Sequence, residues 1–63
     1  MCLAKAYLGE SEAGELILED VALLRVEEGK LLLRSLFGEQ KEVDCTIKTI
    51  DFQKSSIILE SKA

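Results

Sequence analysis

The residue best suited to chemistry in this chain is Cys2, which directly follows Met1. The 63-residue sequence has no histidine and only one other cysteine, Cys45, so one chain cannot supply the ligands of a closed zinc site. The amine of Met1, the amide nitrogen of Cys2 and the Cys2 sulfur do follow one another along the chain, and together they can close fused chelate rings. Such a donor set suits a square-planar ion, Ni(II) or Cu(II).

The fate of Met1 decides which ligands are present. If Met1 is retained, one chain offers its amine, a deprotonated amide and the Cys2 thiolate. If Met1 is removed, Cys2 becomes an amine-thiolate ligand, and a second chain is needed to complete the square. A free thiol titrates near pKa ~8.5, so either version predicts an affinity that rises with pH. The alternative is that Cys2 is a small buried hydrophobe or an incidental thiol.

The length predicts one small domain, residues 1–63, that is only marginally stable as a monomer. A Cys2–Cys45 disulfide is one candidate staple, but no secretory signal marks the sequence, and we expect reduced thiols in the cytoplasm. No apolar run approaches the ~18 residues of a membrane span. A soluble protein that is stabilised by a partner is therefore expected.

Apolar residues recur with a period of two, which predicts strands. The expected strands are 2–8, 15–18, 21–27, 31–37, 41–52 and 56–60, with turns or loops at 9–14, 27–30, 38–40 and 53–55. In the fifth strand the apolar phase switches, which predicts a bulge near Lys48-Thr49. The fold class is all-β: a small curled antiparallel sheet, or an SH3/Sm-like barrel, of five to seven short strands.

Bulky aliphatic side chains fall on both faces of the predicted strands, as in Leu31-Leu32-Leu33 and Ile57-Ile58. One small barrel cannot cover both faces, which favours a homodimer whose interface buries the second face. The alternative is the ordinary scatter of exposed aliphatic residues on a protein surface.

The opening Met1-Cys2-Leu3-Ala4-Lys5, followed by an alternating strand in an acidic chain of this length, resembles the CooT family. Those small nickel-binding accessory proteins are linked to maturation of the nickel enzyme carbon monoxide dehydrogenase. The resemblance implies that Cys2 is the ligand of one Ni(II) shared between two chains of a homodimer, with a nickel-enzyme client. Leu3 carries no donor atom, so the thiolate must do the binding.

The remaining polar residues fit a surface and a core rather than a second site. Cys45 lies in phase with Val43 and Ile47, which predicts a buried core cysteine. The acidic residues expected to form a solvated surface are Glu10, Glu12, Glu15, Glu19, Asp20, Glu27 and Glu28. They lack the spaced oxygen pattern of a calcium loop.

Other classes of function find little support. Without histidine no Ser-His-Asp or Cys-His pair exists, and no phosphate-binding glycine loop occurs, so we expect no enzyme. A net charge of −4, dispersed basic residues and only Tyr7, Phe37 and Phe52 as aromatics disfavour nucleic acid. The alternative to a nickel metallochaperone or store is an Sm-like RNA-binding or protein–protein interaction module with no metal.

Overall fold

The protein consists of β-strands and turns throughout residues 3–62, the part of the chain that its computed structural model describes. The strands are β1 (Ala4–Leu8), β2 (Glu15–Glu27), β3 (Lys30–Ser35), β4 (Gln40–Val43), β5 (Cys45–Asp51) and β6 (Ser56–Ser61). These residues contain no helix that could cross a membrane. The all-β class predicted from the period-two pattern is confirmed.

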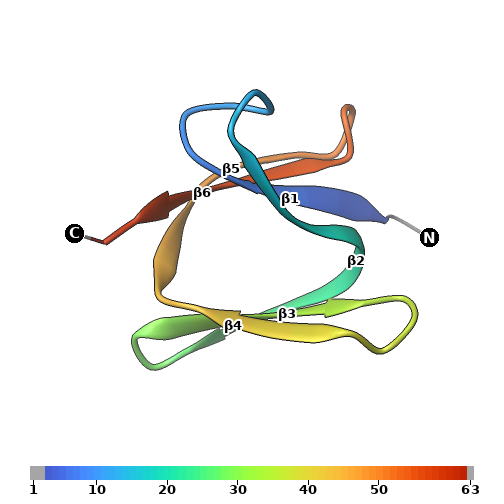
Figure 1. The fold of residues 1–63 in the computed structure, drawn as a ribbon, viewed down its shortest axis with the longest axis vertical. Coiled ribbons are helices and arrows are strands. Elements are labelled where there is room, and N and C mark those ends of the chain that lie inside the picture. The colour runs from blue at the N-terminus through green and yellow to red at the C-terminus, as the bar shows by residue number, and fades with distance from the viewer. Residues whose placement is uncertain (1–2, 63) are drawn as a thin grey trace.

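All of these strands belong to one sheet, in the order β4-β3-β2-β1-β6-β5. Figure 1 shows β1, β5 and β6 on one side of the curled sheet and β3 and β4 on the other, with β2 bending from one side to the other. The small curled sheet is confirmed, and it does not close into a barrel. One feature departs from the purely antiparallel expectation, because β1 and β6 run parallel.

The prediction of one strand from Lys41 to Phe52 is wrong, because Asp44 divides this segment into β4 and β5. These two strands form opposite edges of the sheet, and the curl brings the edges close enough for this short connection. Lys62 contacts this connection, because its Nζ lies 3.3 Å from Asp44 Oδ1. The same Nζ donates a hydrogen bond to the carbonyl of Gly29. The chain thus joins the two edges directly at Asp44, and Lys62, the residue after β6, attaches to this connection and to the turn between β2 and β3.

Asp20 bends β2 without ending it. We expected an interruption at Glu19-Asp20, and Asp20 does take a left-handed φ of 53°. The register of β2 against β3 also shifts between Val21 and Leu23, but the strand continues on both sides. Aspartate tolerates this conformation better than most residues other than glycine. The bend therefore lets one strand serve both sides of the curled sheet.

The strand expected at 31–37 is too long, because β3 ends at Ser35 and Leu36 and Phe37 lie in the turn. Two other local predictions hold. The register of β5 against β6 shifts between Ile47 and Thr49, which confirms the bulge near Lys48-Thr49. Gly29, in the turn between β2 and β3, has a φ of 74°, a conformation that glycine adopts at no steric cost. Short-range sequence signals therefore predicted this bulge and this glycine turn correctly.

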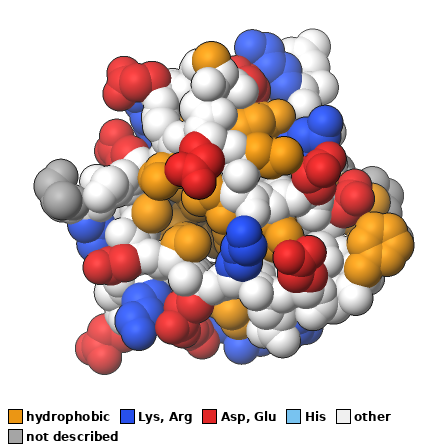
Figure 2. Space-filling model, viewed as in Figure 1, with side chains coloured by type: hydrophobic (Ala, Val, Ile, Leu, Met, Phe, Trp, Pro, Cys, Tyr) orange, Lys and Arg blue, Asp and Glu red, His pale blue; other side chains and the backbone are white. Residues whose placement is uncertain are grey.

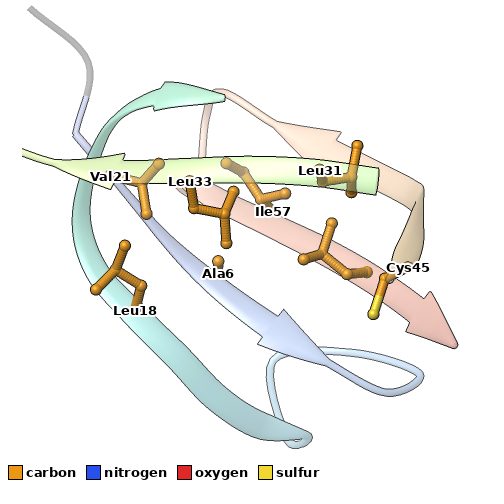
Figure 3. Close-up of a cluster of buried hydrophobic side chains, with 8 residues drawn as sticks. Ala6, Leu18, Val21, Leu31, Leu33, Cys45 and Ile57 are labelled. Atoms are coloured by element: carbon orange, nitrogen blue, oxygen red, sulfur yellow. The ribbon is translucent and has the colours of Figure 1, made fainter. Parts of the chain in front are cut away.

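The core lies between the two sides of the sheet. Figure 3 shows buried side chains of β1, β2, β3, β5 and β6 pointing into this space. The buried cluster consists of Ala6, Leu18, Val21, Leu31, Leu33, Cys45, Ile57 and Leu59. Leu33 and Leu59 are completely buried, and Leu31 and Leu33 alternate with the half-buried Leu32. This is the two-residue period of a sheet with one face on the core.

Candidate functional site

The candidate metal ligands Met1 and Cys2 lie outside the described residues. Leu3, the neighbour of Cys2 in the sequence, is the first residue that the structure describes, and Ala4 is the first residue of β1. Ala4 pairs with Val21 of β2, and on the other side the amide of Lys5 donates a hydrogen bond of 3.0 Å to the carbonyl of Ser55. β1 is therefore held in the middle of the sheet, between β2 and β6.

An apolar groove adjoins this first strand. Its lining comes from Leu3 and Ala4, from residues 21–24 of β2, and from residues 50–52 and 55–57 around the turn between β5 and β6. Among the described residues, Asp51 is the only charged one in the lining, and its Oδ1 already accepts hydrogen bonds from the amides of Gln53 (2.9 Å) and Lys54 (3.0 Å). The groove, which includes Leu3, therefore presents a nearly uncharged surface.

Two large apolar side chains of this groove are open to solvent. Ile50 is 43% exposed and Phe52 is 75% exposed, although both line the groove. The bulge places Ile50 on the same face of β5 as Ile47 and Cys45, because Ile50 pairs with Ile57 and Ile47 pairs with Leu59. Ile50 and Phe52 are exposed because they lie at the end of β5 and in the turn that follows it. Sequence reasoning found the phase switch but missed the groove, which depends on β2 and β5 meeting in space.

Cys45 is a core residue, as predicted. Its thiol is free, it is 8% exposed, and it belongs to the buried cluster with Leu31 and Leu59. Among the described residues, no group of three or more Cys, Asp or Glu side chains is arranged to hold a metal ion. The structure therefore brings no acidic cluster together with Cys45.

The acidic residues singled out in the sequence are all exposed, which confirms a solvated acidic surface. Glu12 has the most defined environment among them, because its Oε2 accepts a 2.9 Å hydrogen bond from the hydroxyl of the buried Ser56. A backbone hydrogen bond at Glu12, and then this hydroxyl, hold the pKa of the carboxyl below its usual value. Glu10 lies 3.6 Å from Lys48, so the loop 9–14 is attached to both β5 and β6.

Charges of both signs are mixed over the surface. Figure 2 shows acidic and basic side chains interspersed on one face, with no continuous basic stripe. Phe37 and Phe52 are exposed but belong to different turns, at the ends of β3 and β5. Proteins that bind single-stranded nucleic acid combine a continuous row of basic side chains with aromatic side chains on which the bases stack, and this face in Figure 2 does not show that combination.

Comparison with known proteins gives the family. The family model described as "CO dehydrogenase accessory protein CooT" matches residues 1–60. An uncharacterized protein of Methanocaldococcus jannaschii, MJ1551, is 35% identical over 60 residues, which cover 95% of this chain and 98% of that protein. A crystal structure assigned as CooT from Carboxydothermus hydrogenoformans superposes with a TM-score of 0.88 at 34% identity, covering 98% of this chain and 100% of that one.

These matches span nearly the whole chain, and the family match includes Met1 and Cys2. The sequence similarity and the structural similarity agree on the same family over the same residues. The resemblance seen in the opening pentapeptide is thereby confirmed. The chain belongs to the CooT family, whose members are accessory proteins of carbon monoxide dehydrogenase and are not themselves enzymes.

Proposed function

We propose that this protein is a nickel-binding accessory protein, a metallochaperone or nickel store, for maturation of a nickel enzyme such as carbon monoxide dehydrogenase. One Ni(II) would be shared between the Cys2 thiolates of a homodimer. The observation that carries the proposal is the position of Cys2, which directly follows Met1 in a CooT-family chain. Its neighbour Leu3 lines the apolar groove.

The donor atoms at the start of the chain fit nickel as cargo. A thiolate with an amine or amide nitrogen from each of two chains gives a planar set of two sulfurs and two nitrogens, which suits Ni(II). Binding requires Cys2 to lose its proton, so the affinity should rise with pH toward and through the thiol pKa. A nickel ion that is held by few protein ligands can also exchange them stepwise for the ligands of an acceptor protein, as nickel delivery requires.

The groove supports a homodimer as the form that binds. A nearly uncharged apolar surface can be buried against a second copy without leaving unpaired charges, which would be costly. Because the groove includes Leu3, an interface built on it would be continuous with the start of each chain. A ligand that binds only the dimer stabilises it by mass action, so nickel should promote dimerisation.

Native mass spectrometry during a Ni(II) titration tests this function. The wild-type protein should take up one nickel per two chains and develop thiolate-to-nickel absorption, and Cys2→Ser should lose both while its circular dichroism stays unchanged. Cys45→Ala is the matched control, because it removes the other thiol from the buried cluster but should leave uptake intact wherever the protein is folded. Nickel uptake by Cys2→Ser equal to that of the wild type would reject the proposal.

A further inference from the structure

We propose that the turn between β3 and β4 is the surface through which this protein docks on its client enzyme, an inference that rests on the accessory function proposed above. The turn holds Leu36 and Phe37 in solvent, with 47% and 81% of their surfaces exposed. An aromatic ring that stands out this far beside a second large apolar side chain is typical of the centre of a protein–protein contact.

The turn is rigid because Ser35 organises its backbone. The Ser35 hydroxyl accepts hydrogen bonds from the amides of Phe37 (3.2 Å) and Glu39 (3.1 Å), and the Ser35 amide donates to the carbonyl of Glu39 (2.8 Å). The amide of Leu36 donates to the carbonyl of Asp20 at 2.8 Å, which ties the turn to the bend in β2. A surface that is already ordered loses less conformational entropy when it binds.

The register of the sheet places this turn near the start of the chain. Ala4 pairs with Val21, and Val21 pairs with Ser35, so these residues form one row across β1, β2 and β3. Adjacent strands lie about 4.8 Å apart, so Ser35 is roughly 10 Å from the first residue of β1. In Figure 1 the β3–β4 turn and the start of β1 also project from the same side of the molecule. A partner that holds the turn is therefore near Ala4, which is two residues from Cys2 in the sequence.

The charges around the turn favour a basic partner over a second copy. Among residues 3–62, Glu19, Asp20 and Glu39 line the hollow beside Phe37 and no lysine or arginine does. Lys41 is the cation next to it, since its ammonium donates a 2.9 Å hydrogen bond to the carbonyl of Ile17, which also lines the hollow. Lys5 approaches Glu19 at 4.0 Å, but within residues 3–62 Asp20 and Glu39 take part in no ion pair. Two copies related by a two-fold axis would bring these carboxylates together, and like charges oppose each other. A partner with an apolar pocket for Phe37, rimmed by Lys or Arg, complements the surface.

Binding to nickel-free carbon monoxide dehydrogenase, measured by biolayer interferometry, tests the proposal. Phe37→Ser should weaken binding about tenfold or more, as expected for an aromatic anchor. The substitution keeps the Phe37 amide that bonds Ser35 and removes a ring that is not in the core. Val26→Ser is the matched control, because Val26 is 69% exposed but pairs with Leu31, at the far end of β3 from the turn. It should change the affinity by less than about twofold.

A charge variant tests the second part of the proposal. Asp20→Asn combined with Glu39→Gln should weaken binding several-fold at low salt and flatten its salt dependence, and asparagine also tolerates the left-handed φ of position 20. Equal binding by Phe37→Ser and the wild type, or no binding of the wild type to the enzyme, would overturn the proposal. Loss of the homodimer in Phe37→Ser would also overturn it and assign the turn to self-association. A Ni(II) titration of the same variants reports on the nickel function separately.

Discussion

The hydroxyl of Ser56 donates a 2.9 Å hydrogen bond to Oε2 of Glu12, which attaches the loop between β1 and β2 to β6. Glu10 and Lys48, 3.6 Å apart, form a second attachment, to β5. The loop that leads from β1 to β2 is thus also attached to β6 and β5. Along the chain the parallel neighbours β1 and β6 are connected only through β2 to β5, so the loop adds a direct attachment between these distant segments.

Acid should weaken this attachment. Its backbone hydrogen bond and the Ser56 hydroxyl lower the pKa of Glu12 in the folded protein below the ordinary 4.5. A lowered folded-state pKa contributes stability that is present above the unfolded pKa and is lost as the pH falls through the folded pKa. Urea unfolding should therefore show Glu12→Gln to be less stable than the wild type at neutral pH. The two should converge in acid, and a gap that stays constant across this range would contradict the prediction.

Leu33 should be the most sensitive aliphatic position of β3. It is completely buried at the centre of the cluster, so Leu33→Ala should cost about 2–5 kcal/mol of unfolding free energy. In a domain this small, such a loss removes much of the total stability. Leu36→Ala, at a position 47% exposed, should cost less than about 1 kcal/mol. Thermal unfolding followed by circular dichroism compares them, and equal losses would mean that the sheet packs differently.

Phe52 should matter for assembly more than for folding. Its ring lines the groove yet is 75% exposed, so Phe52→Ser should leave the free energy of unfolding of the monomer nearly unchanged. If the groove is the dimer interface, the dimer dissociation constant should rise about tenfold or more, since buried aromatics dominate such contacts. Sedimentation velocity across a concentration series measures this, with Val26→Ser as the control. An unchanged constant in Phe52→Ser would remove the groove from the interface.

Local sequence patterns predicted the features of this fold that are local. The glycine turn at Gly29 and the bulge near Lys48-Thr49 each depend on a few neighbouring residues. The interruption expected at Glu19-Asp20 is a bend within one continuous strand. The parallel pairing of β1 with β6 depends on residues some fifty positions apart, such as Ala6 and Ile57, and no short-range pattern encodes it. The break between β4 and β5 at Asp44 was missed for the same reason, because the alternation of apolar and polar residues continues through Asp44.

The prediction for Leu36 and Phe37 was also wrong, since both residues were assigned to the expected strand 31–37. Their apolar character extends the strand pattern, but Ser35 ends the strand by capping the amides of Phe37 and Glu39 with its hydroxyl. For the candidate site, the prediction that Cys45 is a core residue is confirmed, and the metal site at Cys2 stays a prediction. The sequence could not identify the groove, whose residues come from three separate parts of the chain.

Mixed dimers test the central claim, a nickel ion shared between two Cys2 thiolates, most directly. Wild-type chains and mass-tagged Cys2→Ser chains would be combined, exchanged and titrated with Ni(II) under native mass spectrometry, which resolves each dimer by mass. Sharing predicts one nickel on the dimer of two wild-type chains, and none on the mixed dimer at the same free nickel concentration. One nickel on the mixed dimer and two on the wild-type dimer would show that each chain binds its own ion, which would contradict the shared site.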